Sequence, residues 1–313
     1  MLSRIAESLY WVGRYVERAE DTARILDVHV HHLLEDPTVE EEVACRTLLD
    51  VMGARVSDGP VDVNTVSRVL AFAPGDRGSI VGALGAARHN ARGAREAISS
   101  EMWECLNATY IGLPAQLDKA AVAGPHLFFR HVKERSAMLA GLADSTLSRD
   151  DGWRFLVLGR SLERVDMTTR LLAVGLRESS GPSEWITTLL CCSAHEAFLR
   201  TYRRGVKPAL VAEFLVLDRL FPRSAYHALE LAERCLAELR PTSGRVGLDD
   251  EARRFLGRAR TELEFCQARE LLSELPAHLN ALQTASSRAG EAIASCFFRP
   301  ASVLEWSETG GRA

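Results

Sequence analysis

Two segments of the sequence place glutamate and arginine in the same order on what reads as the same helix. Residues 13–26 read GRYVERAEDTARIL, and residues 159–172 read GRSLERVDMTTRLL. Carboxylates and guanidiniums can form buried ion pairs, and arginine can also bind the carboxylates or phosphates of a ligand. The charged residues identical in both segments, here called the ER set, are Arg14, Glu17, Arg18, Arg24, Arg160, Glu163, Arg164 and Arg170.

The location of these charges decides between two interpretations of the ER set. Neighbouring charges differ between the segments, since Asp21 corresponds to Met167 and Glu20 to Asp166. A solvent-exposed ion pair stabilises a protein by roughly 0.2–1 kcal/mol, which is too little to keep four positions identical. A buried charge that loses its partner costs about 3–5 kcal/mol. We therefore favour a buried structural network, and an exposed anion-binding site remains the alternative.

Histidines in two places raise the question of a metal site. The segment HVHH at 29–32 puts His29 and His32 within reach of one helix face, with Glu35 as the nearby carboxylate. Structural and catalytic zinc sites need more donors than this segment supplies. The pair His-Glu at 195–196 begins like the H-E-x-x-H zinc motif, but Leu199 stands at its last position. We expect surface histidines and no bound metal.

Other polar groups are weaker candidates for chemistry. Cys191 and Cys192 precede His195, but free cysteines more often pack as small hydrophobic residues than act as nucleophiles. The polar stretch 99–103 reads as a helix kink, and its Glu101 is a secondary candidate for the site. No glycine-rich loop follows a strand, so we expect no cofactor and no binding of ATP by this chain alone.

Composition narrows the class of protein. The net charge of −4 gives no general attraction to nucleic acid or to an anionic membrane. There is no run of 18 apolar residues, and the sequence starts with an amphipathic helix instead of a signal peptide. The seven cysteines include no C-x-x-C pair, which indicates a reducing compartment. We expect a cytoplasmic protein without nucleic-acid or membrane partners.

Helical periodicity dominates the elements that must position these groups. Apolar residues from Ile5 to Leu33 recur in alternating steps of four and three, which predicts a helix with one buried stripe. No comparable β alternation is present, and prolines and glycines separate about ten predicted helices. The stretch 79–123 reads as one long or broken helix. The sequence therefore predicts an all-α fold.

An internal duplication relates the two segments that carry the ER set. A shift of 146 residues places Gly13 on Gly159, and a shift of 145 places Ser79 on Ser224. We expect related halves at 1–145 and 146–313, packed about a pseudo-twofold axis into one continuous helical bundle. The aspartates at 150–151 should cap the first helix of the second half.

Five stretches together resemble the bacterial alpha-E family over nearly the whole chain. They are MLSRIAESLYWVGRYVERAEDTARIL, SSEMWECLN, VKERS, DDGWRFLVLGRSLERVDMTTRLL and AEFLVLDRLFPRSA. By this resemblance Glu17-Arg18 and Glu163-Arg164 carry the family's Glu-Arg motif. The resemblance implies an all-helical protein encoded beside circularly permuted ATP-grasp ligase-like proteins and transglutaminase-like cysteine peptidases. The first half departs at AFAPGDRGSI, since the Asp-x-x-x-Pro-x-Ser turn is intact only in FLVLDRLFPRSA.

The leading functional hypothesis is a helical partner or substrate-holding subunit of an ATP-grasp-type peptide or amide ligase system. One alternative is an independent enzyme with a Glu- and Arg-lined cleft between the halves, and another is a purely structural scaffold. A solvent-reachable pocket lined by both motifs would favour binding or chemistry. Acid–base catalysis would also require a glutamate with a raised pKa.

Overall fold

The computed structural model describes residues 1–35, 40–56, 59–177, 182–241 and 244–298. These residues form helices joined by turns and contain no β-strand, which confirms the predicted all-α fold. The buried apolar side chains form one cluster with members from nearly every long helix. The division into two halves at residue 145 remains a prediction.

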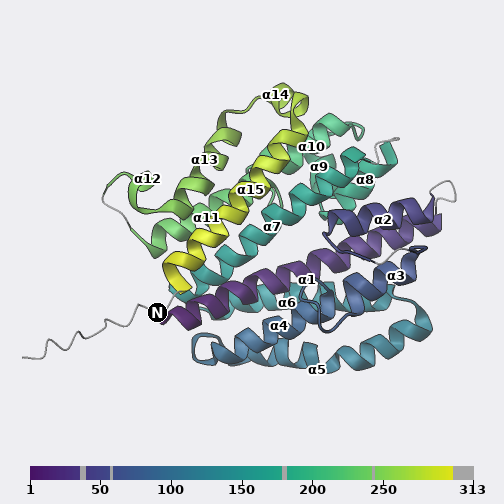
Figure 1. Cartoon of the computed structure of the whole chain (residues 1–313), viewed down its shortest axis with the longest axis horizontal. Helices are drawn as coiled ribbons and strands as arrows, with labels where there is room; N and C mark the ends of the chain where they lie inside the picture. Colours follow the sequence, from purple (N-terminus) through teal and green to yellow (C-terminus); the bar gives the residue numbers. More distant parts are fainter. Residues whose placement is uncertain (36–39, 57–58, 178–181, 242–243, 299–313) are drawn as a thin grey trace, which may run out of the picture.

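Two long helices lie side by side through the middle of the molecule (Figure 1). They are α1 (Ser3–Glu35) and α7 (Asp151–Arg177), which carry the two ER segments. Helices α4 (Ile80–Gly93), α5 (Ser100–Ala123) and α6 (His126–Thr146) lie on the α1 side. Helices α11 (Ala225–Leu239), α13 (Glu251–Phe265) and α15 (Leu275–Ile293) lie on the α7 side. The ER segments are thus inside the bundle.

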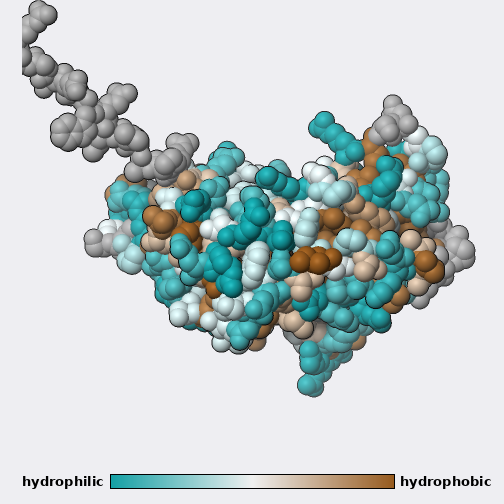
Figure 2. Space-filling view, turned by 90° about the horizontal axis from the view of Figure 1, so that it is seen from below, coloured by the Kyte–Doolittle hydropathy of each residue, from teal (hydrophilic) through white to brown (hydrophobic). Residues whose placement is uncertain are grey.

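Shorter elements complete the chain and exceed the predicted number of helices. They are α2 (Glu41–Val51), α3 (Val63–Ser67), the π-helical turns η1 (Arg68–Phe72) and η3 (Ala294–Phe298), the 3₁₀ turn η2 (Arg95–Ala97), α8 (Pro182–Cys191), α9 (His195–Tyr202), α10 (Pro208–Leu217), α12 (Val246–Asp249) and α14 (Ala268–Ser273). The face seen from below is mainly hydrophilic, with separate small hydrophobic patches (Figure 2).

The stretch predicted as a kink is instead the start of a helix. The side chain of Ser99 caps α5 by accepting a hydrogen bond from the Met102 N–H at 3.1 Å. Two helices therefore occupy 79–123, because η2 and this cap interrupt the helical backbone. The carboxylate of Asp150 similarly accepts the N–H of Trp153 at 3.2 Å, next to the start of α7.

Glycines allow α1 and α7 to approach closely. A Cβ atom on Gly13 would lie 2.0 Å from the carbonyl oxygen of Leu156, and one on Gly159 would lie 2.0 Å from that of Tyr10. Any other residue at either position would force the helices apart. Leu156 occupies the position in α7 that corresponds to Tyr10 in α1, at a shift of 146 residues. The two contacts are therefore reciprocal. This crossing brings the two ER segments face to face.

The turns before α4 and α11 share one cap despite their different sequences. The hydroxyl of Ser79 accepts a backbone N–H at 3.0 Å, and that of Ser224 does so at 3.1 Å. Each hydroxyl also donates to a carbonyl six residues earlier, on Ala73 and Asp218 respectively. The sequence difference at the first turn therefore leaves its serine cap in place.

Candidate functional site

The two motif glutamates lie at the α1–α7 crossing and are almost inaccessible to water. Glu17 is 2% exposed and Glu163 is 1% exposed. Each faces the other helix because it follows its crossing glycine by one helical turn. A carboxylate this deeply buried requires charged or hydrogen-bonding partners to remain ionised.

Arginines of the opposite helix supply those partners. Glu163 accepts hydrogen bonds from the Nε atoms of Arg14 and Arg18, both at 2.6 Å. Glu17 accepts Nε of Arg164 at 2.5 Å and its Nη2 at 3.2 Å. The motif residues therefore pair between helices, with each glutamate neutralised by the other segment.

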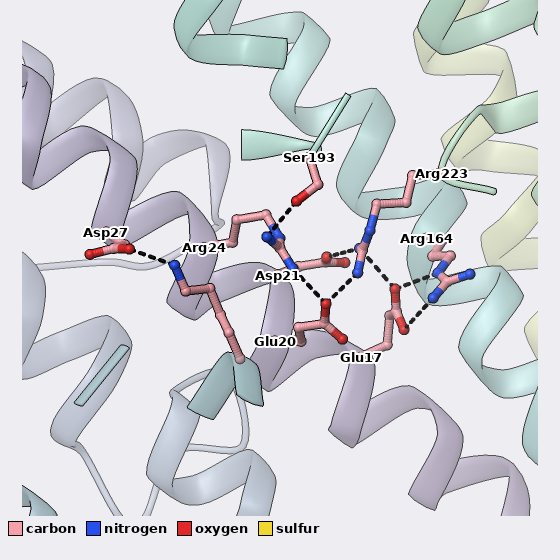
Figure 3. A network of polar contacts seen from close by, with 9 residues as sticks. Glu17, Glu20, Asp21, Arg24, Asp27, Arg164, Ser193 and Arg223 are labelled. Atoms are coloured by element: carbon pink, nitrogen blue, oxygen red, sulfur yellow. Dashed lines mark hydrogen bonds and ion pairs between the residues drawn. The ribbon is translucent and has the colours of Figure 1, made fainter. Parts of the chain in front are cut away.

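A further arginine, which sequence analysis missed, joins this network from the turn before α11. Arg223 donates through Nη1 to Glu17 at 3.0 Å and through Nη2 to Glu20 at 2.5 Å (Figure 3). Nη1 also bonds the buried carboxylate of Asp21. One arginine thus contacts three carboxylates of α1.

The internal comparison contains a signal that points to Arg223. The shared serine cap aligns Arg223 with Gly78, while Asp21 aligns with Met167. The first turn thus has glycine at the position of Arg223, with Arg77 one residue earlier, and the α7 segment has methionine at the position of Asp21. Because Arg223 and Asp21 both lack a counterpart at the matching positions, the comparison indicates that these two residues contact each other. Asp21 considered alone looks like a variable surface residue.

The remaining members of the ER set divide by environment. Arg24 bonds Glu20 at 2.7 Å and Ser193 Oγ at 2.5 Å, and Arg170 bonds Asp166 at 2.9 Å. Nε of Arg160 is buried with no hydrogen-bond partner among the described residues. Burial, followed by the nearby Arg164 charge, lowers the pKa of Arg160.

The secondary candidate lies apart from this network. Glu101 is exposed in the first turn of α5. No hydrogen bond or ion pair joins it to the ER set in the described part of the chain.

Charge interactions set the protonation of the buried acids. Burial raises the pKa of Glu17, but the Arg164 and Arg223 guanidiniums outweigh this effect, and the net pKa lies below its ordinary value. The pKa of Glu163 is likewise lowered, because Arg14 and Arg18 outweigh burial. Neither glutamate has the raised pKa that an acid–base catalyst needs. Both are held as carboxylates.

Asp21 behaves in the opposite way. Burial raises its pKa to about 7, with Arg223 opposing the rise and the charges of Glu17 and Glu20 adding to it. Because these carboxylates share one arginine, the group is protonated more easily than an isolated aspartate. The network can therefore take up a proton near neutral pH.

A polar cleft opens beside the ion pairs, between α1, α7 and α15. Its volume is about 680 Å³. Arg14 and Arg18 line it from α1, and Asp166 and Arg170 line it from α7. The other polar side chains that line it are Asn280, Gln283, Thr284, Ser286, Ser287 and Glu291. Both ER segments thus reach solvent through this cleft, although their glutamates do not.

Other groups considered in the sequence occupy different surroundings. Burial raises the pKa of the Cys192 thiol to about 12, so it is not a thiolate nucleophile at neutral pH. The expectation of surface histidines is wrong for His29, which is 8% exposed and whose pKa burial lowers to about 4. His31 is exposed, whereas the side chain of Glu35 lies outside those that the structure describes.

Among the described helices, none combines the length and apolar character that crossing a membrane demands.

Comparison with known proteins relates the whole helical region to one family. A family model described as a predicted alpha-helical domain with a conserved ER motif matches residues 1–298. An uncharacterized protein of Mycobacterium bovis is 27% identical over 267 residues, covering 77% of this chain and 30% of that protein. Uncharacterized proteins from two Mycobacterium tuberculosis strains, CDC 1551 and H37Rv, are 27% and 26% identical with the same coverage. This chain thus spans about 30% of the length of these relatives.

No solved structure matches the chain. The family match nevertheless includes both crossing helices, their buried glutamates and the cleft beside them. This protein belongs to the Alpha-E family.

Proposed function

We propose that this protein is the substrate-holding helical subunit of an ATP-grasp-type peptide or amide ligase system. The cleft between α1, α7 and α15 is the proposed substrate site. The observation that carries this proposal is the convergence of Arg14, Arg18 and Arg170 on one water-accessible cleft. Guanidiniums fixed in this way suit a carboxylate or phosphate group.

The buried glutamate fixes the arginines that face the cleft. Arg14 and Arg18 both use Nε to bind Glu163, yet their side chains remain 17% and 23% exposed. Their orientation is thereby set before a ligand arrives, which reduces the entropy lost on binding. The ion pairs therefore support binding as well as packing.

The rest of the lining suits an amino acid or a short peptide. Asn280 and Gln283 can hydrogen-bond peptide groups, and Glu291 offers a negative charge for an ammonium group. A volume of about 680 Å³ falls within the usual range for small-molecule sites, roughly 300–1,000 Å³. We propose an anionic or zwitterionic substrate on these grounds.

Two observations support action together with another protein. The relatives carry this region within longer chains, since the match covers 30% of their length. The family resemblance also places such genes beside ATP-grasp ligase-like and transglutaminase-like proteins. We propose the ligase as the main partner and the peptidase as a second one. The seven cysteines all lie within the described residues and form no disulfide, which supports the cytoplasm as the compartment.

An independent acid–base enzyme is less well supported by this geometry. Glu17 and Glu163 are buried and have lowered pKa values. A purely structural scaffold would account for the closed ion pairs but gives no reason for a polar cleft beside them. The substrate-holding role accounts for both.

Reconstitution with the ligase encoded beside this gene tests the proposal. ATP turnover is measured over candidate amino acids with and without this chain, together with co-elution of the two proteins. Ser287→Trp should block the cleft and abolish substrate-dependent turnover, because Ser287 lines it from α15. Ala277→Trp, an exposed change on the same helix outside the cleft, is the matched control. Equal turnover without this chain, or no co-elution, would contradict the proposal.

A further inference from the structure

A second cleft brings two histidines and a buried aspartate together, and Arg24 is the member of the ER set that lines it. It has a volume of about 470 Å³ and lies where α1, α6 and α8 meet. Asp27 and His31 come from α1, and His126 comes from the start of α6. Figure 3 shows Asp27 at the opposite end of the polar network from Arg164.

The donor atoms of these residues converge. One ligand atom from each of Asp27, His31 and His126 lies within 4.8 Å of the other two. Oδ1 of Asp27 is 2.5 Å from Nδ1 of His126. The imidazole rings of His31 and His126 have centroids 5.2 Å apart. Small movements of exposed rings would place all three donors about 2.0–2.2 Å from a single ion.

We propose that Asp27, His31 and His126 form a binding site for a first-row transition-metal ion, with zinc as the best match. Two imidazoles and one carboxylate are a donor set that zinc accepts. A hard cation such as magnesium would require more oxygen donors than this cluster supplies. The proposal is independent of the substrate-holding role.

Neighbouring groups hold two of the donors in place by hydrogen bonds, as groups around metal ligands do in known sites. Nζ of Lys133 lies 2.5 Å from Oδ2 of Asp27, so Oδ1 is the oxygen that would exchange its contact with Nδ1 of His126 for the ion. Nδ1 of His31 faces the backbone carbonyl of Asp27 at 3.2 Å. A proton on that nitrogen would be donated to the carbonyl, and Nε2 would remain free as the ligand.

Three protein ligands also leave a coordination position open. The cleft lined by His32, Thr187 and Leu190 provides room for water or a small ligand there. Sites with three protein ligands and an accessible fourth position are typical of zinc that polarises water or a carbonyl group. The sequence around α1 does not predict this site, because the third donor, His126, lies 99 residues beyond Asp27.

Zinc binding by the full chain tests the proposal directly. The protein is stripped with a chelator and titrated with zinc chloride by calorimetry. A Cys266→Ser, Cys296→Ser background removes the thiols that are not buried. We expect one equivalent of zinc to bind, and His126→Ala or His31→Ala to weaken binding by at least about tenfold. Cobalt(II) should give visible absorption typical of four- or five-coordinate nitrogen and oxygen ligation.

His32→Ala is the matched control, since His32 lines the same cleft but is not one of the three donors. It should leave zinc affinity unchanged. The side chain of His126 is 45% exposed and that of His31 faces the cleft, so neither alanine variant should unfold the protein. Failure to bind zinc, or equal affinity in the His126→Ala and His31→Ala variants and their parent, would overturn the proposal.

Discussion

At the scale of single residues, Glu17 and Glu163 depend on charges supplied by the facing helix. Each is about as buried as the apolar residues around it, and without its arginines each buried charge would destabilise the folded protein. Removing one partner therefore tests whether the network stabilises the fold, which is distinct from its proposed role in positioning cleft arginines.

We expect Glu163→Ala to lower the free energy of unfolding by about 3 kcal/mol, because Arg14 and Arg18 lose their shared carboxylate. Urea unfolding monitored by circular dichroism measures this change. The control is Glu42→Ala, which breaks an exposed pair with Arg46 and should cost less than about 1 kcal/mol. Equal losses in the two variants would show that the buried pair has no special role.

The raised pKa of Asp21 predicts a separate pH effect. An unfolded aspartate titrates near pH 3.9, whereas folded Asp21 titrates at about 7. The folded state therefore binds more protons between these values, and Asp21's contribution to stability is lost as pH rises through that window. Asp21→Asn should remove this part of the pH dependence. Urea midpoints from about pH 4 to about pH 8 measure it, and parallel curves for the variant and its parent would refute it.

The lowered pKa values of Glu17 and Glu163 have the opposite effect on how stability depends on pH. Their contribution is present above the unfolded glutamate pKa of about 4.3 and is lost as pH falls below it. The two effects therefore occupy different pH ranges. The Asp21→Asn variant should still lose stability at low pH, because Glu17 and Glu163 are unchanged in it.

At the scale of helices, the α1–α7 crossing depends on two glycines. Gly13→Ala should destabilise the fold by roughly 1–3 kcal/mol, because its Cβ would overlap the Leu156 carbonyl. Gly112→Ala on α5 is the control, since a Cβ there meets no atom within 4 Å. It should stabilise the protein by up to about 1 kcal/mol through helix propensity. Thermal unfolding of both variants measures the contrast, and a stable Gly13→Ala protein would mean that the crossing is loose.

The sequence predicts the helices better than it predicts their contacts. The apolar stripe of α1 repeats every three to four residues, so its helix and buried face can be read from neighbouring positions. The burial of Glu17 and Glu163 could be inferred because their charges are identical in two segments. Neither Arg223 nor His126 belongs to a segment whose charges are repeated, and their partners on α1 are about 200 and 99 residues away. For Arg223 the only signal is the pair of differences at its own position and at that of Asp21. Periodicity describes one helix at a time and does not determine which distant turn packs against it.

At the scale of the whole molecule, α1 and α7 are enclosed by helices from both parts of the chain (Figure 1). Opening this central pair would expose buried apolar side chains along both helices, whereas α12 has no buried residue and α14 has only Leu271. We expect amide hydrogen exchange to be slowest in the middle of α1 and α7 and fastest in α12 and α14. Exchange measured by mass spectrometry checks this order. Fast exchange at the crossing would show that the central pair is not the most stable unit.

Arg14 and Arg18 have two neighbours, the buried carboxylate of Glu163 and the open cleft. An anion entering the cleft would compete with Glu163 for the same guanidiniums and would raise that glutamate's affinity for a proton. Anion binding would thereby be linked to proton uptake by the protein. The heat of binding measured by calorimetry should then vary with the ionisation enthalpy of the buffer, and the anion should bind more tightly in mildly acidic solution.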